Sequence, residues 1–480
     1  MPTISKDYYD VIVIGTGPAG FSCAVRCAQL GLNTACINNR QDANNKDTHL
    51  NTGSIGTMAL LESAKKYHGL IHEFAQHGIL ANDIILDMSV MLHRKDKILA
   101  EIGDKMIDLF NQHNIDHIHA KARLLSPQQV ELIADNTGLK SVINAKYIIL
   151  ASGSESITLP NIYIDNEFIF DAKAALNINQ VPKKLAIIGA GVMGLELANI
   201  WSRLGAETIL LEAQENFLSV LDHEISGIAF STFQKQGLDL RLGARVISAK
   251  KGNKYINIEY QDQEGTHTLK VDKMIVACGT RPNTDNLAAP EANLLLDQDG
   301  YVYVDNNCRT NLPGVYAVGD LTLLGPMLAH KGIEEGVFVA DFIAGINNPI
   351  NYDILPSVIY TEPEIAWVGQ TEQALRSTGE PINIASYPLN SNIRAIAVDK
   401  REGVVKIIAH AYTDKILGIH IMGNHASELI AEAVLALEFS ASSEDIARTI
   451  HARPTLSESL HDAALILKNR AWNFPEQFNN

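Results

Sequence analysis

A glycine-rich loop between a short apolar run and a helix-like stretch occurs twice in this 480-residue chain. The first loop follows the β-branched run at residues 11–14, and the second follows the apolar run at residues 185–188. Each helix-like stretch ends near a glycine, and a further apolar run follows, at residues 34–37 and 208–211. A strand, a glycine loop, a helix and a second strand make a βαβ unit. The chain therefore carries two such units, about 175 residues apart.

The glycine spacing predicts what each loop binds. In the first loop, we expect Gly15 to permit a tight turn and Gly17 to let a pyrophosphate approach the backbone, while Gly20 lets the helix pack on the strand. The corresponding glycines of the second loop are Gly189, Gly191 and Gly194. The helix N-terminus adds unpaired N–H groups and a positive dipole end. One such match is weak, but two in the same context predict two dinucleotide sites.

The residue that ends the second strand of each unit bears on the cofactor. In the second unit it is Glu212, eighteen residues after Gly194, and its carboxylate is suited to hold ribose hydroxyls. Acidic and amide residues follow it with no arginine nearby, so a 2′-phosphate would be repelled and NAD(H) is predicted over NADP(H). In the first unit the position holds Asn38, whose amide lacks the charge-assisted part of a ribose hydrogen bond.

The rest of the chain divides into a helical and a mixed part. Residues 60–120 are mostly helical in period, and residues 404–409 and 416–422 alternate like an antiparallel hairpin. A helix with an apolar face spans residues 429–437. The predicted fold class is therefore α/β, with two Rossmann-like dinucleotide-binding domains and a C-terminal α+β domain.

Composition excludes several classes of function. The formal net charge of −16 argues against nucleic-acid binding, because the chain has no excess of positive charge to neutralise phosphates. No run of 18 apolar residues exists to span a membrane, and no signal peptide is recognised, so we expect a cytoplasmic protein. The five scattered cysteines match neither a disulfide framework nor a zinc-ligand spacing, so no metal is predicted.

Six further segments, in this order and spacing, resemble the dihydrolipoamide dehydrogenase family, whose relatives include glutathione reductase and the soluble pyridine nucleotide transhydrogenase. The segments are Ala151-Ser152-Gly153-Ser154, Gly279-Thr280-Arg281-Pro282-Asn283, Tyr316-Ala317-Val318-Gly319-Asp320, Pro326-Met327-Leu328-Ala329-His330-Lys331, Tyr360-Thr361-Glu362-Pro363-Glu364 with Ala366-Trp367-Val368-Gly369, and Pro454-Thr455-Leu456-Ser457-Glu458. The resemblance covers almost the whole chain. It implies FAD in the first unit, NAD(H) in the second, and a homodimer formed by the C-terminal domain.

The resemblance also implies domain limits and residue roles. The FAD-binding domain would comprise residues 1–150 and 276–349, the NAD-binding domain 151–275 and the dimerisation domain 350–480. Asp320 would hydrogen-bond the ribityl chain of FAD, and the Pro454 segment of each subunit would complete the active site of the other. Further cofactor contacts would come from Ala122, Ser152, Gly153, Met327, Leu328 and Ala329 toward FAD, and from Val246 and Gly279 toward NAD.

The chain departs from the family where the family keeps its redox-active cysteines. The family pattern Gly-Gly-x-Cys-x-x-x-x-Cys-Ile-Pro-Ser-Lys aligns with residues 46–58, and the two cysteine positions hold His49 and Ser54. Neither residue can form a disulfide. Cys23 and Cys27 lie four apart on a predicted helix, where a bridge would be strained, and we expect them to pack in the core.

Two other family positions are changed. Met58 replaces a lysine that in relatives pairs with a glutamate aligned with Glu196, so Glu196 is expected to lack its partner or take up a proton, and the reduction potential of FAD to be lower. Arg453 replaces the family's acid/base histidine while Glu458 is retained. Arginine stays protonated, so Arg453 would clamp Glu458 or hold an anionic substrate.

Three functions follow as hypotheses. The first is an NADH-dependent flavin oxidoreductase that serves a small-molecule acceptor, such as a quinone, a second nicotinamide, oxygen or an anionic oxidant. His49 is then either a proton donor or a space-filling residue. The second is dihydrolipoyl dehydrogenase itself, as a subunit of a 2-oxoacid dehydrogenase complex. The third is a catalytically silent FAD-binding assembly subunit.

Overall fold

The computed structural model describes residues 6–38, 52–134 and 137–472, and the chain forms two compact units. Unit 1 comprises Met1–Ala59, Ser89–Ile157 and Gly279–Tyr352. Unit 2 comprises Leu60–Met88, Thr158–Cys278 and Asp353–Asn480. Helix α2 (Thr52–His72) runs through the boundary at residues 59 and 60.

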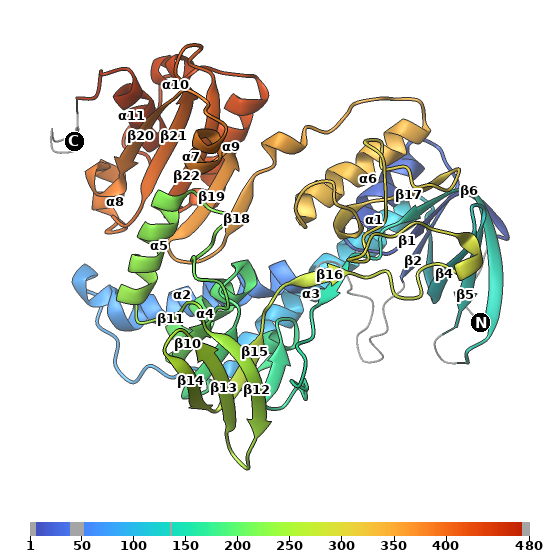
Figure 1. Ribbon diagram of the computed structural model, residues 1–480, viewed down its shortest axis with the longest axis horizontal. Coiled ribbons are helices and arrows are strands. Elements are labelled where there is room, and N and C mark those ends of the chain that lie inside the picture. The colour runs from blue at the N-terminus through green and yellow to red at the C-terminus, as the bar shows by residue number, and fades with distance from the viewer. Residues whose placement is uncertain (1–5, 39–51, 135–136, 473–480) are drawn as a thin grey trace. The chain divides into compact units, whose positions relative to one another are not determined.

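A seven-stranded sheet forms the centre of unit 1, with the strand order β3-β2-β1-β6-β5-β4 and with β17 beside β6 (Figure 1). Strands β1, β2, β3, β6 and β17 pair in parallel, whereas β4 and β5 join as an antiparallel extension. The strands are β1 (Tyr8–Ile14), β2 (Thr34–Asn38), β3 (Asp116–His119), β4 (Lys121–Ser126), β5 (Gln129–Ile133), β6 (Lys140–Leu150) and β17 (Val315–Ala317).

Helices cover this sheet because its central strands are apolar on both faces. Residues 11–14 of β1 are fully buried. Helices α1 (Pro18–Gln29) and α6 (Ala329–Ile343) pack closely, because a Cβ at Gly336 would stand 2.3 Å from the Ala19 carbonyl oxygen. Unit 1 also holds most of α3 (Met88–Gln112) and a two-stranded antiparallel sheet of β7 (Ser154–Ser156) and β16 (Thr280–Pro282).

Unit 2 begins with a second parallel sheet in the order β11-β10-β9-β15-β8. These strands are β8 (Ile169–Asp171), β9 (Lys184–Ile188), β10 (Glu207–Leu211), β11 (Asp239–Arg241) and β15 (Lys273–Val276). Helices α4 (Val192–Arg203) and α5 (His223–Lys235) connect them. A three-stranded antiparallel sheet accompanies it, formed by β12 (Arg245–Lys251), β13 (Ile256–Asp262) and β14 (Gly265–Val271).

The C-terminal part of unit 2 is an antiparallel sheet with helices, drawn in orange to red in Figure 1. Its strand order is β18-β19-β22-β21-β20. The strands are β18 (Ser357–Ile359), β19 (Glu364–Gly369), β20 (Ile382–Pro388), β21 (Val404–His410) and β22 (Ile416–Gly423). The helices are α7 (Glu372–Ser377), α8 (Ile393–Ala397), α9 (Ala426–Glu438), α10 (Ser443–Arg448) and α11 (Glu458–Leu467). The predicted hairpin is the antiparallel pair β21–β22.

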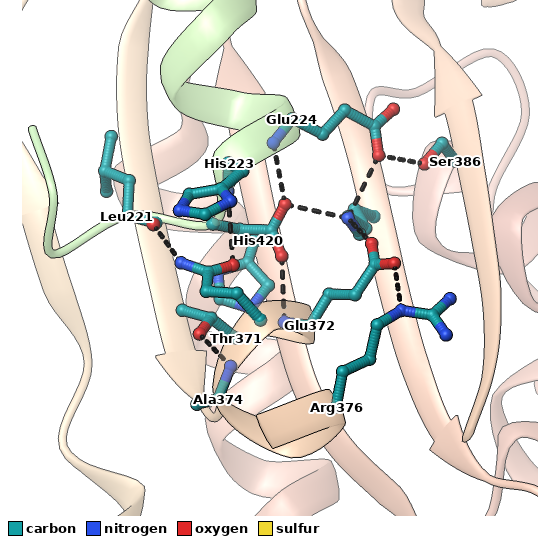
Figure 2. Close-up of polar contacts among 12 residues, drawn as sticks. Leu221, His223, Glu224, Thr371, Glu372, Ala374, Arg376, Ser386 and His420 are labelled. Carbon is teal, nitrogen blue, oxygen red and sulfur yellow. Dashed lines mark hydrogen bonds and ion pairs between the residues drawn. The ribbon is translucent and has the colours of Figure 1, made fainter. Parts of the chain in front are cut away.

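A buried ion cluster fixes the start of α5 within unit 2. The Lys406 ammonium on β21 lies 2.7 Å from Asp222 Oδ1, 2.6 Å from Glu372 Oε2 and 3.1 Å from Glu224 Oε2. Asp222 caps α5 by accepting a hydrogen bond from the Glu224 backbone N–H at 3.0 Å, and its other oxygen accepts one from the Glu372 N–H. Figure 2 shows two of these carboxylates, Glu224 at the start of α5 and Glu372 at the start of α7. We call this group the Lys406 cluster.

The predicted α/β fold class is confirmed: two Rossmann-like parallel sheets and a C-terminal α+β part are present. The predicted domain boundaries stay a prediction. Across the described ranges, no helix is both long and apolar enough to cross a membrane.

Candidate functional site

The first glycine loop connects β1 to α1 in unit 1. Gly15 has a φ of +120°, and a Cβ there would lie 2.1 Å from the Ala151 carbonyl oxygen. A Cβ at Gly20 would lie 2.0 Å from the Gly15 carbonyl oxygen, so neither position accepts a side chain. At Gly17, a Cβ would meet none of the described atoms within 4 Å. Helix α1 begins there without a side-chain cap, which leaves its positive end open toward an anion.

The second loop, between β9 and α4 in unit 2, repeats this geometry. A Cβ at Gly194 would lie 2.0 Å from the Gly189 carbonyl oxygen, and one at Gly191 would meet none of the described atoms within 4 Å. Helix α4 also begins without a side-chain cap. Each loop thus presents bare backbone at a helix N-terminus, the form that a dinucleotide pyrophosphate requires.

Glu212 follows β10 directly and turns its carboxylate onto this second loop. Its Oε2 accepts a hydrogen bond from the Ala190 backbone N–H at 2.8 Å, and its Oε1 accepts one from the Gln214 N–H at 2.9 Å. The carboxylate therefore lies beside the glycine loop, as a ribose-holding residue must. Arg241 on the adjacent strand β11 is bound by both carboxylate oxygens of Asp239 and is hydrogen-bonded to the Tyr260 hydroxyl.

Three segments that are distant in sequence meet beside the first loop in unit 1. The Ser154 hydroxyl donates to Asp320 Oδ2 at 2.6 Å. This hydrogen bond joins the start of β7 to the segment after β17, where Asp320 lies. The Ser152 hydroxyl donates to the Asn283 carbonyl oxygen at 2.7 Å. Asp320 lies in the short helix η4 (Gly319–Leu321), and a Cβ at Gly319 would lie 3.2 Å from the Ala19 Cβ. The loop at residues 151–154, η4 and α1 therefore form one site.

The remaining residues predicted to contact FAD or NAD lie as follows. Asn38 ends β2 and is buried, and Ala122 is buried in β4 within the core of unit 1. The sulfur of Met327 accepts a hydrogen bond from the Thr280 hydroxyl at 3.1 Å. The other positions are Gly153 before β7, Leu328 and Ala329 at the start of α6, Val246 in β12 and Gly279, whose carbonyl oxygen accepts from the Ile157 N–H at 3.1 Å.

The positions that replace the family's cysteines and lysine are only partly described. His49 lies outside the described residues. Ser54 is half-buried and Met58 is exposed, both near the start of α2. All five cysteines lie within the described ranges and are free thiols.

Glu196 is a buried carboxyl group on α4 in unit 2. Its Oε1 accepts a hydrogen bond from the Tyr360 backbone N–H at 3.0 Å. Burial raises the pKa of this carboxyl from 4.5 to about 7, and the Tyr360 N–H offsets only part of that shift. Glu196 therefore gains and loses a proton near neutral pH.

Arg453 forms a clamp at the other predicted end of the active site, also in unit 2. Its Nε donates to Glu458 Oε1, its Nη2 lies 3.6 Å from Asp462 Oδ1, and its guanidinium stands 4.3 Å from the centre of the Trp472 ring. The other oxygen of Glu458 accepts from the Thr455 N–H at 2.9 Å. Of the two roles expected for Arg453, the clamp on Glu458 is the one that these contacts display.

The two loops fit dinucleotides, and the Asp320–Ser154 pair fits the hydroxyl-bearing chain of a flavin cofactor. The fold and these sites together define a two-dinucleotide oxidoreductase. Residues 9–336 match the profile described as pyridine nucleotide-disulphide oxidoreductase, and residues 355–464 match the dimerisation domain of the same name. The chain therefore belongs to the pyridine nucleotide-disulphide oxidoreductase family, an enzyme family that uses FAD and NAD(H), and is dihydrolipoyl dehydrogenase-like.

Relatives of known sequence agree with this assignment, and a solved structure shares the fold. The chain is 41% identical over 472 residues to dihydrolipoyl dehydrogenase of Cupriavidus necator, covering 97% of this chain and 99% of that protein. It is 38% identical over 462 residues to leghemoglobin reductase of Vigna unguiculata, covering 96% and 88%. Its fold resembles that of LpdA from Mycobacterium tuberculosis with a TM-score of 0.86 at 24% identity, covering 95% of this chain and 99% of that one.

Sequence reasoning missed several side chains that shape these sites. Lys331 and Glu335 on α6 are fully buried beside Gly319, although their i,i+4 spacing is visible in the sequence. Arg241 lies close to the Glu212 backbone because β11 pairs with β10, and only the sheet pairing brings the two together.

Proposed function

We propose that this chain is an NADH-dependent flavin oxidoreductase whose electrons leave to an acceptor other than a disulfide. The observation that carries the proposal is the pair of residues at the family's cysteine positions, His49 and Ser54. An imidazole and a hydroxyl cannot store two electrons as a dithiol does. Bound FAD supplies the two-electron chemistry between NADH and the acceptor.

The cysteines present elsewhere are poorly suited to replace that pair. Burial raises the pKa of Cys36 and brings that of Cys308 to about 12 and that of Cys278 to about 11. Cys23 and Cys27 lie one turn apart on α1, and a hydrogen bond with Cys27 together with burial raises the pKa of the Cys23 thiol. Thiolates are the reactive form, so raised pKa values favour a packing role.

The acid/base position supports the same proposal. Guanidinium groups are permanent cations in proteins, and that of Arg453 lies between the carboxylates of Glu458 and Asp462. A guanidinium in that state cannot take a proton from a thiol. By contrast, the residues expected to bind NAD(H), which are Glu212 and the second glycine loop, are retained.

Dihydrolipoyl dehydrogenase is the second candidate, and the identity of 41% to the Cupriavidus necator enzyme favours it. Under this alternative, Cys23 and Cys27 are the cysteine pair to test, because they lie four residues apart on α1 and their thiols are hydrogen-bonded to each other. Association with a 2-oxoacid dehydrogenase complex belongs to this alternative. A small-molecule acceptor belongs to the first proposal, and the cytoplasmic location stays a prediction under either.

An acceptor comparison separates the two. NADH oxidation is measured with oxidised lipoamide, a water-soluble quinone, a nicotinamide analogue and oxygen. We expect kcat/KM for at least one non-disulfide acceptor to exceed that for lipoamide by a hundredfold or more. Lipoamide turnover that equals the others, and that disappears in Cys23→Ser and Cys27→Ser but survives in Cys308→Ser, establishes the alternative instead.

A further inference from the structure

Helix α6 in unit 1 buries two opposite charges, one turn apart. The side chains of Lys331 and Glu335 are both 0% exposed, and Lys331 Nζ lies 3.3 Å from Glu335 Oε1. Removing two charges from water carries a desolvation penalty, which is offset only if the charges pair closely and their polar atoms find hydrogen-bond partners. The contacts of these two side chains show where those partners are.

Both charges contact one peptide residue. Glu335 Oε2 accepts a hydrogen bond from the Gly319 backbone N–H at 2.6 Å, and the Lys331 ammonium donates to the Gly319 carbonyl oxygen at 3.0 Å. The Tyr352 hydroxyl donates to the remaining oxygen of Glu335 at 3.1 Å. The charge pair therefore holds the donor and the acceptor of Gly319 at once.

Gly319 needs these contacts because the backbone hydrogen bond within its own turn is weak. Its φ is +73°, in the left-handed region, and a Cβ at this position would make a tight contact of 3.2 Å with the Ala19 Cβ on α1. Within η4 the closing backbone bond, from the Thr322 N–H to the Gly319 carbonyl oxygen, is long at 3.3 Å. The next residue in the turn is Asp320, whose carboxylate is held by Ser154 at 2.6 Å.

The two charges depend on each other. Burial raises the pKa of Glu335, and the Lys331 ammonium opposes that rise. Only an ionised Glu335 gives a charge-assisted bond to the Gly319 N–H. Lys331 therefore favours the ionised state in which Glu335 binds the Gly319 N–H most strongly.

We propose that Lys331 and Glu335 are positioning residues for FAD. Their hydrogen bonds from α6 to the backbone N–H and carbonyl oxygen of Gly319 orient the neighbouring Asp320 carboxylate toward the polyol chain of the cofactor. The inference rests on the FAD-binding role of Asp320, which the family resemblance implies. It assigns a binding function to two side chains that do not themselves reach the cofactor.

The test compares two neutral double variants as FAD-loaded protein. Lys331→Met with Glu335→Leu removes both side-chain hydrogen bonds to Gly319. Lys331→Met with Glu335→Gln keeps an acceptor for the Gly319 N–H. FAD retention is measured by dilution of the holoenzyme, alongside the visible circular dichroism of the bound flavin and the melting temperature. We expect FAD binding to weaken at least tenfold in the Leu variant and clearly less in the Gln variant, with an altered flavin spectrum.

Two further variants make the outcome decisive. Asp341→Asn changes another charged residue of α6, which pairs with Arg26 on α1, and serves as the control, with FAD binding unchanged. Asp320→Asn tests the role on which the inference rests: if it retains FAD normally, that role is wrong. If Asp320→Asn loses FAD while both double variants bind it within twofold of the unaltered protein, the positioning role is overturned. If the Leu variant does not fold, the Gln variant is compared with the unaltered protein, and an unchanged affinity is again a refutation.

Discussion

Glu196 is an ionisable residue at a buried position, where the charged form of its carboxyl group is energetically unfavourable. The carboxyl is buried, and its hydrogen bond comes from the neutral Tyr360 N–H. In the unfolded chain it ionises near its ordinary value of 4.5, whereas in the folded chain it does so at about 7. Between these values the unfolded state releases the proton and the native state keeps it, so this group lowers stability as pH rises.

The substitution Glu196→Gln isolates that effect. A glutamine keeps the acceptor for the Tyr360 N–H but has no charge to bury. We predict a gain in unfolding free energy of about 3 kcal/mol at pH 8 and almost none at pH 4.5, since one pKa unit corresponds to about 1.4 kcal/mol. Melting temperatures at pH 5, 6, 7 and 8 measure it. A constant difference across this range would show that Glu196 does not titrate there.

Arg453 offers a second prediction for single residues. Glu458 is 3% exposed, and removal of its cation leaves a buried carboxylate with only the Thr455 N–H and more distant groups. The Arg453 side chain is itself 39% exposed, so we expect Arg453→Ala to cost about 1–2 kcal/mol, below the range for fully buried pairs.

A double variant checks the origin of that cost. Arg453→Ala with Glu458→Gln removes the unpaired charge and should recover at least half of the lost melting temperature. If Arg453→Ala instead leaves stability unchanged but raises KM for an anionic acceptor, the guanidinium binds substrate and the clamp is secondary.

At the scale of elements, the Lys406 cluster joins α5, α7 and β21. Burial alone would raise the pKa of Asp222, but the Lys406 ammonium holds it below its ordinary value. The stability from this pair is therefore present near neutral pH and is lost as pH falls through the lowered pKa. Figure 2 shows Glu224 and Glu372, the two other carboxylates that contact Lys406.

Lys406→Met should be among the more damaging substitutions in unit 2. It leaves Asp222 fully buried without its cation, which costs about 3–5 kcal/mol. Arg376→Met is a matched control, because Arg376 contacts the same Glu372 at 2.7 Å but is 62% exposed, and its loss should cost less than about 1 kcal/mol. Equal melting temperatures for the two variants would contradict the role given to the cluster.

The sequence predicted the elements well wherever the signal was local. The β-branched run at residues 11–14 became the buried core of β1, and Gly15, Gly17 and Gly20 meet the steric requirements expected of them, because turn geometry and helix packing act over a few residues. The pairing of Arg453 with Glu458 was one of two expected roles, and the two residues lie only five apart.

Contacts that depend on tertiary packing could not be predicted. The partners of Lys406 come from residues 222, 224 and 372, and nothing in the sequence brings them together. The burial of Lys331 and Glu335 follows from the close packing of α6 on α1, whereas their spacing alone is typical of an exposed helical ion pair.

At the scale of the whole molecule, this two-dinucleotide enzyme keeps both glycine loops, while His49 and Ser54 stand at the positions aligned with the family's cysteines. Under the proposed function there is no second redox centre, so FAD would store the electrons from NADH, and each subunit would hold two electrons in place of four.

An anaerobic titration with NADH counts those electrons directly. The account predicts that the flavin absorbance reaches its end point at one equivalent of NADH for each FAD, with no long-wavelength thiolate–flavin band on the way. An end point at two equivalents, with such a band after the first, would contradict it and return a redox-active cysteine pair to this enzyme.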